Sequence, residues 1–147
     1  MDQLKLENQI CFPFYAISRL IIRGYQPYLE KLGITYPQYL VLLVLWEKDN
    51  VSVQYITEKL ILNTNTVTPL LKRMESMGLI SRQKAKDDER KVMVSLTKEG
   101  QDLKISAAQI PQKLLENMGD VAIELEDLVA MRNKIQDWIG CMGSSQS

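Results

Sequence analysis

Residues 63–100 decide the fold of this chain and read NTNTVTPLLKRMESMGLISRQKAKDDERKVMVSLTKEG. In the first half of this stretch, Val67, Leu71 and Met74 recur at helical spacing, and Gly78 stands where such a helix would end. Beyond Gly78, residues of different character alternate with a period of two, which is typical of β-strands. The stretch therefore predicts a helix followed by a β-hairpin.

The segments around this stretch complete a recognisable order of elements. Residues 53–60 predict a brief helix, and a turn at 61–63 separates it from the helix described above. In the hairpin, strands near 80–84 and 92–96 flank the charged loop 86–90. A short helix, a tight turn, a second helix and a basic hairpin follow one another in a winged helix-turn-helix. We therefore expect a mainly α (α+β) protein of this class, with long N- and C-terminal dimerisation helices.

Two long helices are expected before the motif. Apolar residues at helical spacing open a helix near Ile10 that can run to about Lys31, and Pro13 belongs in its first turn because proline lacks an N–H. Thr35 caps a second helix that reaches Glu47. The solid apolar run of this second helix predicts burial on all sides.

Further helices are expected after the hairpin. Thr97 caps one of them, and Pro111 limits or bends it. The last helix carries an apolar face that is too long for a peripheral helix of so small a domain, so we expect it to pack on a second subunit. The residues of this face are Val121, Leu125, Leu128, Ile135 and Ile139.

The expected domain organisation follows from these elements. We predict a single winged-helix domain over residues 1–142 and a flexible polar tail at 143–147. Within the domain, the DNA-binding lobe covers about 50–97, and the dimerisation helices cover about 5–32 and 98–142.

The composition limits the function classes. The chain has 147 residues, of which 46% are hydrophobic, with two cysteines and no histidine, so zinc fingers and histidine-based catalysis are excluded. We expect no metal, no cofactor and no enzymatic activity. No apolar run reaches membrane-spanning length, so we expect a cytoplasmic protein without a membrane partner. The net charge is zero, but residues 51–100 hold nine basic and six acidic side chains, which suits contact with phosphates.

The second helix of the motif and the hairpin carry the expected contacts to double-stranded DNA. Short hydrogen-bonding side chains at the start of the helix suit base edges, and the cations that follow suit phosphates. Arg90 is expected to enter a minor groove, whereas Asp88 either structures the wing or is only a solubilising charge. The expected DNA-binding residues are Thr64, Asn65, Thr66, Thr68, Lys72, Arg73, Lys84, Lys86 and Arg90.

Cys11 is the candidate for redox chemistry. It stands near the N-terminus of the first long helix, where unpaired N–H groups and the helix dipole favour a thiolate. From its position alone, the role of a small buried hydrophobic residue is favoured, because most cysteines without a disulfide pack in this way.

The motif resembles that of a known family. The sequence D-x-R at 88–90, followed by L-T-x-x-G at 96–100, is similar to the wing signature of the MarR family of transcriptional regulators. Residues 63–75 resemble the recognition helix of that family, and the similarity extends over roughly residues 5–105.

Within that family, the chain resembles the organic hydroperoxide resistance regulators at residues 5–12 and 34–39. Two features depart from their pattern. The helix begins Asn63-Thr-Asn where those regulators have Asp-Ser-Gly, so base preference can differ, and Pro13 lies close to the cysteine.

The resemblance implies a homodimeric repressor that binds a pseudo-palindromic operator and releases it when an organic hydroperoxide oxidises Cys11. It also implies that Tyr25 and Tyr36 of the partner subunit activate the Cys11 thiol by donating phenolic hydrogen bonds to its sulfur. Cys141 of the partner is a possible resolving thiol, and a small-molecule thiol is the alternative.

Two other functions stay open. A repressor of the same fold could respond to a phenolic or aromatic ligand, with Cys11 incidental. A thiol enzyme is the weakest alternative, because no activating base stands beside the thiol and Arg19 is two helical turns away.

Overall fold

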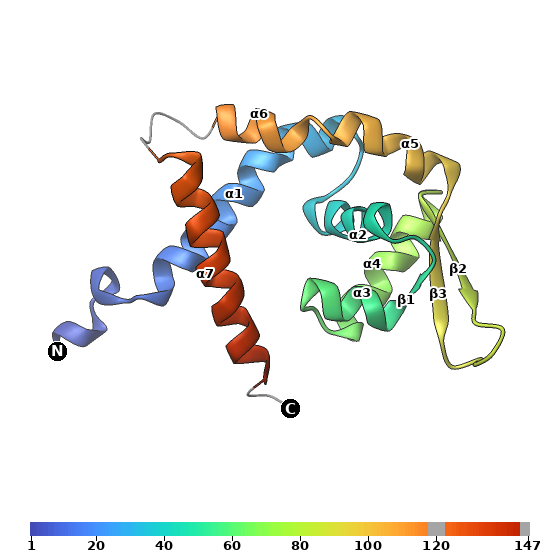
Figure 1. The fold of residues 1–147 in the computed structure, drawn as a ribbon, viewed down its shortest axis with the longest axis horizontal. Helices are drawn as coiled ribbons and strands as arrows, with labels where there is room; N and C mark the ends of the chain where they lie inside the picture. Colours follow the sequence, from blue (N-terminus) through green and yellow to red (C-terminus); the bar gives the residue numbers. More distant parts are fainter. Residues whose placement is uncertain (118–122, 145–147) are drawn as a thin grey trace. The chain divides into compact units, whose positions relative to one another are not determined.

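The computed structural model of the chain describes residues 1–117 and 123–144. The chain divides into two compact units, Met1–Glu116 and Asn117–Ser147 (Figure 1). The organisation as one regulator domain over residues 1–142 stays a prediction. No helix among the described residues is long and apolar enough to span a bilayer.

The first unit opens with two short 3-10 helices, η1 (Asp2–Leu4) and η2 (Leu6–Asn8), which were not predicted. The long helix α1 (Cys11–Lys31) follows and confirms the predicted helix. Pro13 is its third residue, where a missing N–H costs no intrahelical hydrogen bond. Gly33 has a φ of 69° and ends the helical path.

Thr35 is the N-cap of helix α2 (Tyr36–Glu47), as predicted. The backbone N–H of Thr35 donates to Oε1 of Gln38 at 2.9 Å, which satisfies a backbone donor at the start of the helix. The buried side of α2 includes Leu42 and Leu45, but Leu43 is 41% exposed. The prediction of burial on all sides is therefore wrong for the isolated chain, because the core covers only part of the helix surface.

The helix-turn-helix consists of α3 (Val53–Leu60) and α4 (Thr64–Ser76), with the predicted boundaries. The backbone N–H of Tyr55 donates to Ser52 Oγ at 3.1 Å at the start of α3. Ile61 adopts a left-handed conformation with φ 55° and turns the chain. Four residues of α4 face the core, namely Val67, Leu70, Leu71 and Met74.

The predicted hairpin is confirmed by β2 (Ile80–Lys84) and β3 (Val92–Leu96). A short strand, β1 (Val51–Ser52), adds to β3, so the antiparallel sheet has the order β1-β3-β2. The hairpin register pairs Ile80 with Leu96 and Lys84 with Val92. Val94, at the centre of the sheet, is fully buried and anchors the base of the hairpin in the core.

Two helices complete the first unit. In α5 (Lys98–Ala107), the backbone N–H of Gly100 donates to the Thr97 hydroxyl at 3.1 Å, which confirms the predicted cap. Helix α6 (Ile110–Glu116) then begins, with Pro111 as its second residue. The proline therefore limits the preceding helix by starting a new one.

The described part of the second unit contains one helix, α7 (Leu125–Ser144). The helix includes Gly143 and Ser144, which we had expected in the polar tail. Residues 145–147, and Val121 of the predicted apolar face, lie outside the described residues. Leu125, Ile135 and Ile139 of that face are between 39% and 64% exposed in the single chain.

Candidate functional site

Helix α4 carries its predicted DNA-contacting side chains on the side that faces away from the core. Its buried stripe faces the hydrophobic cluster, and the opposite side carries short polar residues followed by two cations. Thr68 is half-buried, and the exposed residues are Thr64, Asn65, Thr66, Lys72 and Arg73. The helix therefore presents hydrogen-bonding groups at its N-terminal end and positive charge further along.

The tip of the hairpin is organised around one carboxylate. Oδ1 of Asp88 accepts the backbone N–H of Arg90 at 3.0 Å and its Nε at 3.2 Å. The Arg90 side chain is 91% exposed, so most of its guanidinium surface is available for a partner molecule. Lys84 and Lys86 are exposed on the same hairpin. Asp88 thus orients a cation at the tip.

An open groove of about 700 Å³ joins α4 to the hairpin. It is lined by two of the predicted α4 residues, Thr64 and Thr68, and by Asp88 and Arg90 from the hairpin. Hydrogen-bonding side chains and a cation are therefore gathered on one concave surface. The other predicted residues do not line the groove, namely Asn65, Thr66, Lys72, Arg73, Lys84 and Lys86.

The groove also has lining residues that sequence reasoning missed, among them Ser52, Gln54, Arg82 and Lys91. Gln54 comes from the first turn of α3, where nothing in a local pattern distinguishes it from an ordinary solvated residue. Arg82 could have been suspected from its place near the base of a basic hairpin.

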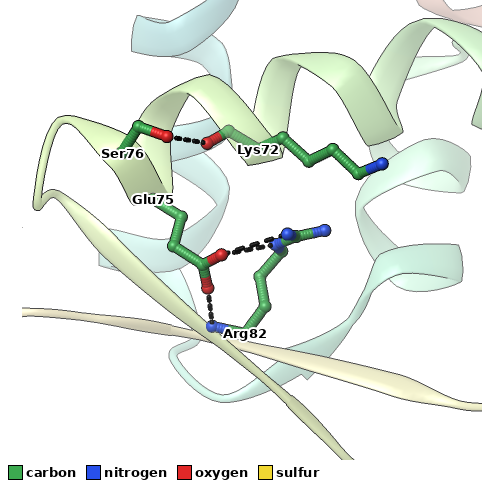
Figure 2. Close-up of polar contacts among 4 residues, drawn as sticks. All are labelled: Lys72, Glu75, Ser76 and Arg82. Carbon is green, nitrogen blue, oxygen red and sulfur yellow. Dashed lines mark hydrogen bonds and ion pairs between the residues drawn. The ribbon is translucent and has the colours of Figure 1, made fainter.

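Arg82 is held by a carboxylate from α4 (Figure 2). Glu75 Oε1 accepts Nε of Arg82 at 3.3 Å and Nη2 at 3.0 Å, and Oε2 accepts the backbone N–H of the same arginine at 2.8 Å. These hydrogen bonds lower the pKa of Glu75 below its ordinary value, so it is a carboxylate at neutral pH. The pair links the last turn of α4 directly to β2.

The thiol of Cys11 is exposed in the single chain, at the first residue of α1. Tyr25 belongs to the same helix, and a rise of about 1.5 Å per residue places it roughly 20 Å along the axis from Cys11. One chain therefore does not bring these two predicted site residues together. A contact between them requires a second copy of the chain.

Tyr25 and Tyr36 do lie together, with ring centroids 5.0 Å apart, and Tyr39 packs against both. Burial raises the pKa of Tyr25 to about 12, with smaller contributions from Tyr39 and Tyr36. Burial also raises the pKa values of Tyr36 and Tyr39. The phenols are therefore protonated at neutral pH and can act as hydrogen-bond donors.

Cys141 is exposed near the end of α7, in the second unit. Its role as a resolving thiol stays a prediction. Across residues 1–117 and 123–144, no group of three or more His, Cys, Asp or Glu side chains could hold a metal ion.

Comparison with known proteins gives a consistent assignment. Residues 23–106 match the family described as transcriptional regulator SarA/Rot. Over 114 residues, the chain is 52% identical to the organic hydroperoxide resistance transcriptional regulator of Bacillus subtilis, and the match covers 78% of each chain.

Solved structures of a Staphylococcus epidermidis regulator, AbfR, share the fold. Its reduced, DNA-bound form has a TM-score of 0.80 at 32% identity, with 97% of each chain covered. Its disulfide form has a TM-score of 0.64 at 33% identity, with 94% of this chain and 95% of the other covered. The chain therefore belongs to the SarA/Rot family of MarR-type winged helix-turn-helix transcriptional regulators, in the group that includes the organic hydroperoxide resistance regulators.

Proposed function

We propose that this protein is a homodimeric repressor that binds a pseudo-palindromic operator in double-stranded DNA and releases it when an organic hydroperoxide oxidises Cys11. The observation that carries DNA binding is the groove in which Thr64 and Thr68 of α4 and Arg90 of the hairpin line one surface. A helix in the major groove and an arginine in the adjacent minor groove would use both parts of that surface.

Exposed apolar surface on α1 and α7 supports the homodimer. All side chains of α7 from Leu125 to Gly143 are exposed in the single chain, apart from the half-buried Leu128. On α1, Ile17 and Leu20 are 47% and 55% exposed. Surfaces of this kind are typical of an interface that a second subunit covers. A second copy would also bring Tyr25 within reach of Cys11, which the length of α1 prevents within one chain.

The proposed chemistry needs no cofactor. The Cys11 thiolate attacks the terminal oxygen of the hydroperoxide, the O–O bond breaks, and the sulfur becomes a sulfenic acid while the alkoxide fragment takes a proton and leaves as an alcohol. The sulfenic acid then condenses with a second thiol, either Cys141 of the partner or a small molecule, with loss of water. Tyr25 and Tyr36 would stabilise the thiolate through their phenolic hydrogens.

The test uses a duplex that the parent protein selects from a random pool, with binding followed by fluorescence anisotropy. One equivalent of cumene hydroperoxide should release the parent protein but not Cys11→Ser, which should bind normally without oxidant. Cumyl alcohol is the matched control, because it has the same apolar body without an O–O bond. If Cys11→Ser leaves the duplex as readily as the parent after peroxide addition, oxidation of Cys11 is not the signal.

A repressor released by a phenolic or aromatic ligand is the second candidate. A recess of about 290 Å³ beside Tyr36 favours it, with apolar walls from Ile22, Leu29 and Ile34. Its volume is close to the lower end of the range for small-molecule sites. Release by salicylate or by cumyl alcohol, in both the parent and Cys11→Ser, would support this candidate over oxidation.

A further inference from the structure

The hairpin is attached to α4 by more than the connecting chain. The link between Ser76 at the end of α4 and Ile80 at the start of β2 is short and contains Gly78, whose φ of 76° reverses the chain. By itself this link fixes the start of β2 but leaves the angle of the hairpin to other contacts. The Glu75–Arg82 pair supplies such a contact within the next strand residues.

The Glu75 carboxylate accepts hydrogen bonds from both the side chain and the backbone of Arg82, which is the third residue of β2. The backbone hydrogen bond matters most for geometry, because it fixes the strand and not only a flexible side chain. Arg82 pairs with Val94 of β3, so a restraint on this residue is passed to both strands. Figure 2 shows the carboxylate of Glu75 reaching from α4 to β2 at this point.

The restraint acts where two parts of the groove must be aligned. Thr64 and Thr68 line it from α4, while Arg90 lines it from the end of the hairpin. A small rotation of the hairpin about its base would displace Arg90 from α4 by an amount that grows along the strands. Contacts by both parts to one duplex therefore require a fixed angle.

We propose that Glu75 is a positioning residue for operator binding, which sets the angle between the hairpin and α4 by holding Arg82. This inference rests on the proposed DNA-binding function. Glu75 itself has no role in contacting DNA, because a carboxylate near phosphates is repelled.

The charge of Glu75 makes the direction of the effect diagnostic. Removing a negative charge beside a duplex should by electrostatics alone strengthen binding. A positioning role gives the opposite sign, because the loosened hairpin loses part of the Arg90 contact. Glu75→Gln should therefore weaken binding about five- to tenfold at fixed salt, the range expected for coupling between neighbouring groups.

The matched control is Glu89→Gln, which removes one negative charge at an exposed position of the hairpin loop. It should leave affinity unchanged or raise it. Urea unfolding of each variant checks that the loss of affinity is measured on folded protein. Glu75→Asp, which keeps the charge but shortens the reach, serves as a second variant and should also weaken binding.

A double-mutant cycle with Arg90→Ala separates positioning from general loss of structure. If Glu75 acts by positioning Arg90, Glu75→Gln should lower duplex affinity less than twofold in the Arg90→Ala background. An equal loss in both backgrounds, or tighter binding by Glu75→Gln, would overturn the proposal. Failure of the parent protein to bind any duplex would refute the proposed function, and the positioning role with it; normal parent binding with unchanged Glu75→Gln would refute the positioning role alone.

Discussion

The rings of Tyr25 on α1 and Tyr36 on α2 pack with their centroids 5.0 Å apart and their planes at 52°. Tyr39 extends this cluster, at 5.7 Å from Tyr25 and 6.2 Å from Tyr36. Such tilted pairs stabilise the packing of one helix on the other. Burial in this cluster keeps each phenol protonated, which is the state that a hydrogen-bond donor to a thiolate requires.

The first prediction concerns stability at alkaline pH. An exposed tyrosine ionises near pH 10.0, whereas the folded-state pKa of Tyr25 is about 12. Between these values the unfolded chain loses the proton and the folded chain keeps it, so the free energy of unfolding falls as pH rises from 10 to 12. Tyr25→Phe should flatten this fall, as measured by urea unfolding at a series of pH values, while Tyr55→Phe serves as the control. Equal slopes for the parent and Tyr25→Phe would contradict the raised pKa.

The second prediction tests the thiol-activating role. Tyr36→Phe keeps the ring in the cluster and removes only the hydroxyl, so duplex binding should persist. If the hydroxyl stabilises the Cys11 thiolate, less thiolate is present at neutral pH, and release by cumene hydroperoxide should be about tenfold slower. Stopped-flow anisotropy measures this rate. A rate as fast as that of the parent protein would assign Tyr36 to packing alone.

The sequence predicts the elements whose signals are local. The periods of 3.6 and 2 that meet at Gly78 identify α4 and the hairpin, and the confirmed boundaries of α3 follow from the same patterns. Burial of α2 was less predictable. Leu43 belongs to an unbroken apolar run, but only the fold determines which side of that run the core covers.

The parts of the site that the sequence does not predict depend on tertiary contacts. Glu75 stands in the last turn of an amphipathic helix, where an isolated acid is usually solvated, and only the reversal at Gly78 brings it to Arg82. The surroundings of Cys11 depend on a second chain, so neither local pattern nor the fold of one chain defines them. The thiol-activating roles of Tyr25 and Tyr36 were predicted only from the family resemblance.

The third prediction concerns the hairpin tip. Arg90→Ala should weaken duplex binding about tenfold at fixed salt, because a highly exposed guanidinium is removed from the groove without loss of core packing. The slope of log K against log salt should fall by about one if the side chain contacts a phosphate. Anisotropy titrations at several salt concentrations measure both. An unchanged dissociation constant would remove Arg90 from the interface.

The fourth prediction concerns the junction between the hairpin and α5. A Cβ atom at Gly100 would overlap the carbonyl oxygen of Leu79, which is backbone and cannot move aside as a side chain could. Gly100→Ala should therefore lower the free energy of unfolding by about 3 kcal/mol. Gln101→Ala, at the next and exposed position of α5, is the control and should change stability by less than about 0.5 kcal/mol. If Gly100→Ala hardly changes the free energy of unfolding, the start of α5 can move away from the backbone at Leu79 at little cost.

The last prediction tests the homodimer through α7. Ile135 lies on the apolar face of this helix and is 39% exposed in the single chain. If this face forms an interface, a second subunit covers Ile135. A carboxylate buried in the interface without a partner costs roughly 2 kcal/mol or more, and two-fold symmetry places the substitution twice in one dimer. Ile135→Glu should therefore raise the dissociation constant of the dimer about a thousandfold, which sedimentation velocity over a range of concentrations would detect. Asn133→Glu adds the same charge on the other side of α7 and should leave the dimer intact. Because two linked recognition helices bind a palindrome far better than one, Ile135→Glu should also lose duplex affinity at nanomolar protein. A parent protein that sediments as a folded monomer at micromolar concentration would rule out the dimer and the contact between Cys11 and Tyr25 that depends on it.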